Sequence, residues 1–467
     1  MGASTDVSSL VRNYWSVLLG NALEWYEFAI YGCMATYMEQ NFFRGSVLAT
    51  WLGFTATFVA RPLGGIFLGI LSDAFGRKLA VMLTIVGMLS GTVGQGLLPT
   101  PRGAGDSAWG SFGLVLLFSL RLLQGLCTGG EISTVSTYIV EVSGHESKGR
   151  CVALISITVN LGFLLARTVV WSLQLILGEE RMLDWGWRLP FILALLPGAM
   201  ALAGRRDLKE SEEFQAQKEA REAGAANSKS GASLSEHFVN VLVGIGGVIA
   251  FAVFQYGGMV WTNSFLEKHG APANMPMLAG MCSRVLQMVL SFFVGWFADC
   301  YGVALVTLAS GAMLCCAGAP FFFLLASYPD NVANIFLIYG VGYGIIGAMV
   351  GTVVFMYCAE LFPTSVRNLG VGISYNIGFS IFGGFAPLVA EASLGWSLYG
   401  PGLLLSAAGL LTLLTVVISM MGLRAGKLKL AYLRPELYFG MSSKSSGSGS
   451  KKPDSARQAQ FTCVAGV

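Results

Sequence analysis

The chain has 467 residues, of which 54% are hydrophobic and 12% are charged, whereas ordinary soluble domains carry about 25% charged residues. Its formal net charge of +3 is too small to indicate a nucleic-acid partner, and the basic residues lie in loops between apolar runs. The composition therefore excludes an ordinary soluble domain and indicates an integral protein of the lipid bilayer.

A spanning helix needs about 20 mostly apolar residues, and twelve candidate runs follow one another along the chain. The first six lie at 13–38, 47–71, 79–98, 111–141, 151–177 and 186–204. The second six lie at 237–266, 275–298, 303–327, 331–359, 367–391 and 398–423. These runs predict an all-α membrane protein with twelve transmembrane helices.

Polar segments separate the two sets of six runs and follow the last one. Residues 205–236 are charged and rich in small residues, and the end of the chain is rich in Ser, Gly and Lys. We expect an N-terminal bundle (1–204), a cytoplasmic linker (205–236), a C-terminal bundle (237–423) and a largely disordered cytoplasmic tail (424–467). The Lys/Arg bias of the loops places both termini in the cytoplasm.

A short polar hinge after the second run has a weaker copy in the second half. The hinge reads G-x-x-x-D-x-x-G-R-K from Gly69 to Lys78, and the copy reads G-x-x-x-D-x-x-G from Gly295 to Gly302. The two motifs stand nearly half the chain apart. A duplicated membrane unit of this kind predicts two pseudo-symmetric six-helix bundles, an architecture typical of transporters.

Ionisable residues interrupt several of the apolar runs. Each costs ~2.5–3.5 kcal/mol or more inside a membrane and is therefore a functional candidate. Seven of them stand out, namely Glu24, Glu27, Arg61, Arg121, Glu131, Arg167 and Arg284. Counting along the runs places Glu24, Arg61, Arg121 and Arg284 near the middle of the membrane. Together these residues predict a polar cavity between the helices.

Glu24 and Glu27 lie one turn apart on the same helix face. We expect one of them to bind a coupling proton, and Arg121 to stabilise the carboxylate until it is protonated; the alternative is a static buried ion pair. The candidates for substrate binding are Arg61, Gln124, Glu131, Arg284, Gln255, Tyr256, Tyr375 and Asn376.

The arginines and acids within the runs also bear on the charge of the substrate. Four arginines stand against three acids, which favours a substrate with a carboxylate group. Arg284 is the best candidate of the second half for contacting that group, and Arg167, nearer the outer mouth, is its competitor. Trp261 and Asn263 are further candidates for the cavity wall, and Glu131 is expected to pair with Arg61 or to belong to an inner gate.

Five motifs carry a resemblance to a known family. They are Gly20–Phe28, Arg61–Gly65, Gly69–Lys78, Arg121–Glu131 and Glu360–Arg367. With these motifs the chain resembles the major facilitator superfamily, and within it the metabolite:proton symporter group, whose members carry proline/betaine, 2-oxoglutarate, citrate or shikimate. The resemblance implies proton-coupled symport of a small organic acid or zwitterion by alternating access. It also implies a monomer in the plasma membrane.

The hinge is expected to form a conformational latch on the cytoplasmic side. Asp73 would lie at the positive N-terminal end of the eleventh helix, and Arg77 would bridge Asp73 and Glu141. The simpler alternative is that Arg77 and Lys78 only orient the loop. The expected latch residues are Gly69, Asp73, Gly76, Arg77, Lys78, Glu141, Glu360 and Arg367.

The chain also departs from the group, and other functions stay open. Glu27 stands where relatives usually have Asp, and the second hinge copy lacks the Arg-Lys pair. The alternative functions are a facilitative uniporter and a non-transporting sensor on the same scaffold. An enzyme is not expected, nor a metal or cofactor other than the coupling proton, because the sequence has no phosphate-binding loop and His145, His237 and His269 lie at run ends or in loops without metal-ligand spacing.

Overall fold

The computed structural model describes residues 7–75, 77–100, 102, 108–143, 147–206, 237–362 and 366–424. For some of these residues only the backbone is described, namely 13, 69–75, 77–81, 108–110, 138, 141, 142, 204–206 and 424. The predicted linker and tail therefore lie outside the described residues, apart from the backbone at 205, 206 and 424. Throughout the described ranges the regular structure is helical, with no β-strand.

The first half forms six membrane passes, three of which are built from more than one helix. The passes are α1 (Val7–Cys33) with α2 (Ala35–Phe42), α3 (Val47–Phe75), α4 (Arg77–Gly96), α6 (Ala108–Thr128) with α7 (Glu131–Val142), α8 (Lys148–Asp184), and η1 (Gly186–Arg188) with α9 (Leu189–Leu193) and α10 (Leu195–Arg206). The break between α6 and α7 falls at Gly129 and Gly130, because glycine is a poor residue for a helix interior.

The second half repeats the pattern, and three of its passes contain a π-helical segment. The passes are α12 (Phe238–Val253) with η3 (Phe254–Trp261) and α13 (Thr262–Lys268), α14 (Met275–Tyr301), α15 (Val303–Ser327), α16 (Val332–Asn334) with η4 (Ile335–Gly342) and α17 (Tyr343–Glu360), α18 (Arg367–Gly378) with η5 (Phe379–Gly383) and α19 (Ala386–Leu394), and α20 (Gly400–Arg424). The π-helical segments are η3, η4 and η5. Such segments are rare in proteins, and where they occur they often lie at functional sites.

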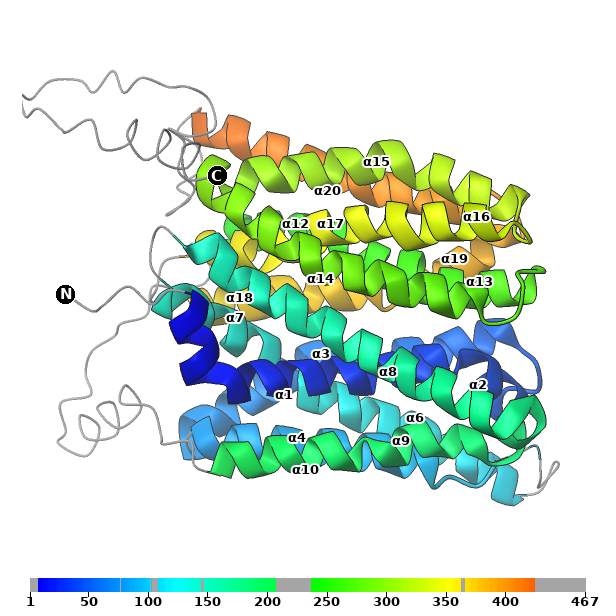
Figure 1. Ribbon diagram of the computed structural model, residues 1–467. Helices are drawn as coiled ribbons and strands as arrows, with labels where there is room; N and C mark the ends of the chain where they lie inside the picture. Colours follow the sequence, from blue (N-terminus) through cyan, green and yellow to red (C-terminus); the bar gives the residue numbers. More distant parts are fainter. Residues whose placement is uncertain are drawn as a thin grey trace, which may run out of the picture.

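The helices run roughly side by side, and the two halves form adjoining bundles (Figure 1). Between the halves, α8 packs on α14, and α3 packs on α18, η5 and α19. The start of α1 and the end of α20 lie at the same end of the molecule (Figure 1), as an even number of passes requires. The twelve-helix prediction is confirmed. Ten passes are long and apolar enough to cross a membrane by themselves; α1 and α4 supply the other two.

Close approach of α8 to its neighbours depends on glycine. A Cβ atom built at Gly149 would lie 2.3 Å from the carbonyl oxygen of Gly295 on α14, and one at Gly162 would lie 2.2 Å from the carbonyl oxygen of Ala22 on α1. Both distances are far below van der Waals contact. The small residues therefore let α8 contact both halves at backbone distance, which is how membrane helices commonly pack.

Candidate functional site

A buried ion pair joins α1 to α3 in the first half. An Nη2 of Arg61 lies 3.9 Å from Oε1 of Glu24, and the side chains are 0% and 1% exposed. None of the three guanidinium nitrogens of Arg61 has a hydrogen-bond partner in the described structure. Instead, the guanidinium lies over the rings of Phe28 and Phe379 at 5.1 and 5.3 Å. Arg61 is thus held by one carboxylate and by aromatic faces.

A chain of hydrogen bonds connects Glu27 with Arg121. The Thr92 hydroxyl donates to Oε2 of Glu27 at 2.8 Å, Gln124 Nε2 donates to the same hydroxyl oxygen at 3.0 Å, and Arg121 Nη1 donates to Gln124 Oε1 at 3.0 Å. All four side chains are buried. A change in the charge of Glu27 can therefore be passed on to Arg121 of α6 through side chains of the first half alone. Thr92 was missed by the sequence analysis, because an isolated threonine in an apolar run carries no signal.

Arg121 does not face a carboxylate directly in this conformation. Its Nε and Nη2 donate to the backbone carbonyls of Gly53 and Phe54 on α3, at 3.4 and 3.1 Å. Its guanidinium also lies 4.1 Å from the ring centre of Tyr31. Arg121 was expected to stabilise the carboxylate of Glu24 or of Glu27; the structure places Arg61 next to Glu24 and links Arg121 to Glu27 through Gln124 and Thr92. The reason is geometric, since Arg121 is occupied by the carbonyls of the facing helix.

Glu24, Glu27 and Glu131 line one small cavity inside the first half. Its walls come from α1, α4, α7 and α10. The position of Glu131 there follows from the break before α7, which makes it the first residue of that helix. The structure thus brings three acids predicted from the sequence to one place.

Arg284 is a fully buried cation on α14 of the second half, and it reaches across to α8. Its Nη1 donates to Oδ1 of Asn160 and to Oε1 of Gln255, both at 3.0 Å. One face of the guanidinium lies 4.2 Å from the ring centre of Phe163. Nε and Nη2 have no hydrogen-bond partner in the described structure. Arg284 is 0% exposed, so these two donors lie away from the protein surface.

Arg167 is anchored differently. Its Nη1 donates to Asn263 Oδ1 at 2.8 Å, and its Nη2 donates to the Met259 carbonyl and the Tyr339 hydroxyl, both at 3.1 Å. The Met259 carbonyl lies in the π-helical segment η3 and also accepts from Tyr339 at 2.6 Å. Arg167 thereby braces α8 against η3 and η4.

Aromatic rings fill the space between the two halves. Tyr256 of η3 lies 5.0 Å from Phe58, 5.4 Å from Phe379 and 6.4 Å from Phe163, measured between ring centres. Tyr375 stacks on Phe379 at 4.9 Å. The hydroxyls of Tyr256 and Tyr375 are buried without a hydrogen-bond partner in the described structure. These rings connect the surroundings of Arg61 with those of Arg284.

The remaining predicted cavity residues have structural contacts. Asn376 Nδ2 donates to the carbonyl of Gly129 at 2.6 Å, which joins α18 to the break between α6 and α7. Trp261 Nε1 donates to Glu391 at 2.8 Å. Both contacts hold helices together at the cavity edge.

At the end of the bundle where α14 ends and α8 begins, the second hinge copy joins the halves. Asp299 at the end of α14 accepts from the backbone N–H groups of Gly149 and Arg150, in the first turn of α8, and from Arg150 Nε at 3.0 Å. The carboxylate thus lies at the positive end of a helix from the other half. The sequence analysis recognised the copy but assigned the latch role only to the first one.

The predicted latch of the first hinge lies almost entirely outside the described side chains. Gly76 lies outside the described residues, and only the backbone is described at Gly69, Asp73, Arg77, Lys78 and Glu141. Arg367 is described, and its Nε donates to the carbonyls of Ala359 and Phe362 at 3.2 and 3.4 Å. It therefore caps the end of α17, next to Glu360.

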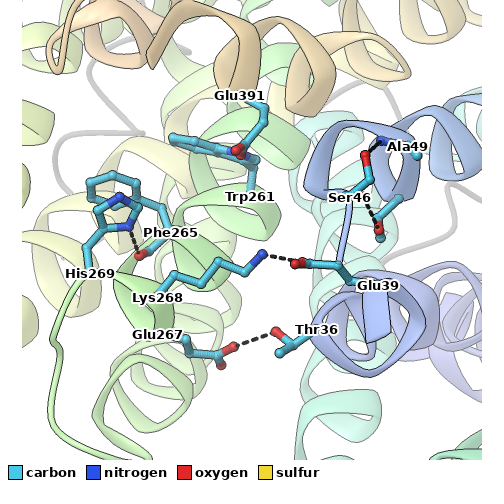
Figure 2. Close-up of polar contacts among 11 residues, drawn as sticks. Thr36, Glu39, Ser46, Ala49, Trp261, Phe265, Glu267, Lys268, His269 and Glu391 are labelled. Atoms are coloured by element: carbon cyan, nitrogen blue, oxygen red, sulfur yellow. Dashed lines mark hydrogen bonds and ion pairs between the residues drawn. The ribbon is translucent and has the colours of Figure 1, made fainter. Parts of the chain in front are cut away.

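At the opposite end of the bundle, which is the outer side in the predicted orientation, a second set of polar contacts joins the halves (Figure 2). Lys268 at the end of α13 pairs with Glu39 of α2. Thr36 of α2 donates to Glu267 at 3.5 Å. Glu267 also accepts from Asn263, the residue that binds Arg167. These outer contacts had no sequence signal, because the partners come from two helices, α2 and α13, that lie more than 200 residues apart in the sequence.

Comparison with known proteins gives a consistent result. Residues 13–241 match the family described as "Sugar (and other) transporter". The chain is 31% identical over 406 residues to the ectoine/proline transporter ProP of Corynebacterium glutamicum, covering 80% of this chain and 76% of that protein. It is 32% identical over 432 residues to the glycine betaine/proline/ectoine/pipecolic acid transporter OusA of Dickeya dadantii, covering 88% and 83%.

Solved structures show the same fold at lower sequence identity. The proton:xylose symporter XylE bound to 6-bromo-6-deoxy-D-glucose has a TM-score of 0.69 and 18% identity, covering 92% of this chain and 99% of that one. A partially occluded inward-open form of XylE from E. coli has a TM-score of 0.67 and 15% identity, covering 87% and 96%. At this identity the likeness extends to the fold.

Proposed function

The chain belongs to the metabolite:proton symporter group of the major facilitator superfamily, and on that premise we propose that it moves a small polar organic metabolite together with a proton by alternating access. The metabolite is an organic acid or a zwitterion such as proline or betaine, the solutes named for its relatives ProP and OusA. Membership of this family makes the protein a transporter and not an enzyme.

The observation that carries the proposal is the Glu24–Arg61 pair. Its two charges are buried at 1% and 0% exposure, where a carboxylate keeps its charge only with a compensating partner. A proton on Glu24 removes the attraction that holds Arg61 to α1. Protonation and the arrangement of α1 and α3 are therefore linked, which is what coupling requires.

Glu27 forms a second branch of the same machinery. Its carboxylate accepts from Thr92, and Thr92 is linked through Gln124 to Arg121, which holds the backbone of α3. Both acids thus act on α3 by different routes, Glu24 through Arg61 and Glu27 through Arg121. The coupling proton belongs to this pair of acids as a unit.

Alternating access follows from the contacts between the halves. Asp299 joins them on one side, and the Lys268–Glu39 and Thr36–Glu267 contacts join them on the other. Opening either side requires that its own set of contacts breaks; on the Asp299 side the end of α14 leaves the start of α8, while the rest of the α8–α14 packing stays in place. Rocking of two rigid bundles about a central site is the simplest motion that does this.

The setting of the protein is part of the proposal. Both termini lie in the cytoplasm, and the protein acts as a monomer in the plasma membrane, without a cofactor besides the proton. The positive-inside bias of the loops supports this orientation. The start of α1 and the end of α20 lie at the same end of the bundle, which agrees with both termini being on one side of the membrane (Figure 1).

The test is uptake by purified protein in liposomes with an imposed pH gradient, acidic outside. Wild type should concentrate a labelled substrate, whereas Glu24→Gln should fail to concentrate it and should still exchange labelled for unlabelled substrate. Thr128→Ser, which keeps a buried hydroxyl whose hydrogen bond goes to the Gly125 carbonyl, serves as a control with normal uptake. Accumulation by Glu24→Gln and Glu27→Gln alike would place the proton elsewhere, and wild-type flux that ignores the gradient would indicate a uniporter.

A further inference from the structure

We propose that the Nε–Nη2 edge of Arg284 is the site that binds the carboxylate group of the transported solute. The inference rests on the proposed function, since it assumes a small organic solute, and it assigns the residue and the chemical group that decide recognition. It comes from comparing the hydrogen bonds of the four buried arginines that the sequence analysis singled out within the apolar runs, Arg61, Arg121, Arg167 and Arg284.

Two of the four arginines have few free hydrogen-bond donors for a solute. Arg121 uses all three guanidinium nitrogens on Gly53, Phe54 and Gln124. Arg167 uses both terminal nitrogens on Asn263, Met259 and Tyr339, and only its Nε remains. A single N–H cannot form the paired hydrogen bonds with which arginine recognises a carboxylate.

Arg61 has open nitrogens but already has an anion. Its partner Glu24 lies at 3.9 Å, and both are buried. A solute carboxylate at Arg61 would compete with Glu24 and would stand close to a like charge unless the acid carried a proton. Arg61 is therefore assigned to coupling.

Arg284 has the free edge and no anionic partner in the described structure. Its two open nitrogens, Nε and Nη2, are adjacent on the guanidinium and donate in parallel, which matches the two oxygens of a carboxylate. Its remaining nitrogen is fixed by Asn160 and Gln255, and its face is covered by Phe163. The group is held in place before any solute arrives, so little conformational entropy is lost on binding.

Other open donors gather beside Arg284. Gln255, which holds Nη1 through its oxygen, leaves its Nε2 without a partner, and the hydroxyl of the next residue, Tyr256, is also unpartnered in the described structure. Both side chains are buried, at 2% and 0% exposure. Buried donors without acceptors are rare in folded proteins. A solute that brings oxygen acceptors to Arg284 would also offer a partner to the Gln255 amide, which is bonded to the same guanidinium.

The experiment measures binding without a proton gradient, with protein in nanodiscs and calorimetric titration. The probes are pairs that differ at the carboxylate: proline and prolinamide, glycine betaine and choline, succinate and succinamide. Wild type should bind the acid of at least one pair about ten-fold or more tightly than its partner. Arg284→Gln should remove that preference by weakening the acid alone, and Arg284→Lys should restore part of it, because lysine keeps the charge without the fork.

Arg167→Lys is the matched control, since it alters a neighbouring buried arginine whose terminal nitrogens are occupied; it should lower thermal stability and keep the acid preference. Melting curves establish that each variant is folded. The proposal is overturned if Arg284→Gln keeps the preference, if Arg167→Lys loses it instead, or if wild type binds no acid better than its partner. If binding depends on Arg284 but uptake does not respond to the pH gradient, the proposed proton coupling is wrong and the assignment of Arg284 stands.

Discussion

Asp299→Asn should open the side of the protein where α14 ends and α8 begins, which is the cytoplasmic side in the proposed orientation. The carboxylate of Asp299 is 4% exposed and accepts from two backbone N–H groups of α8 and from Arg150. Asparagine keeps the shape and one acceptor oxygen but loses the charge. A charge at a helix N-terminus contributes ~0.3–1 kcal/mol, and up to ~2 when partly buried, and a charged hydrogen bond exceeds a neutral one by ~1 kcal/mol.

These terms together give about 2 kcal/mol in favour of the closed cytoplasmic side. Because every 1.4 kcal/mol is ten-fold in an equilibrium constant, the ratio of inward-open to inward-closed protein should rise roughly 30-fold. The interaction exists only when the end of α14 meets the start of α8. The variant should therefore shift this equilibrium without a matching loss of overall stability.

The assay is the rate of maleimide labelling of Ser133→Cys in a background without other cysteines. Ser133 is 6% exposed and faces Gly372 across the contact between α7 and α18, so it becomes accessible when the cytoplasmic side opens. Arg150→Gln is the control. It removes an ion pair whose arginine is 34% exposed, worth ~0–1 kcal/mol, and should raise labelling less than about five-fold. Wild-type labelling in a folded Asp299→Asn variant would refute the reasoning.

Two further predictions concern the outer side and the packing of α8. Glu39→Gln removes the partner of Lys268 and should increase labelling of an outer-cavity cysteine while decreasing that of Ser133→Cys; parallel changes on both sides would contradict a gate. Gly162→Ala places a Cβ 2.2 Å from a backbone oxygen of α1 and should cost ~1–3 kcal/mol, seen as a lower melting temperature. The control Gly372→Ala meets only ordinary contacts, at 3.4 Å, and equal melting of the two variants would count against the packing argument.

Much of the fold could be predicted because a membrane imposes a simple rule on sequence. Each pass must be a run of mostly apolar residues, so the twelve runs and the polar linker between them are visible along the chain. The cost of burying a charge in lipid also marks Glu24, Arg61 and Arg284 as candidate site residues, because an ionisable residue in an apolar run is rare unless it has a function. The paired hinge motifs indicated two related halves, because the motif recurs nearly half the chain apart.

The partners of these charges were decided by the tertiary structure alone. Glu24 meets Arg61 rather than Arg121, since the carbonyls of Gly53 and Phe54 lie within reach of Arg121. Hydrogen-bond partners depend on differences of an ångström between helices that are far apart in sequence, and hydrophobic periodicity does not encode them. The sequence by itself determined which residues are buried charges; only the packing of α8 against α14, close enough for Asn160 and Phe163 to hold Arg284 on one side, decided which edge of that arginine stays open.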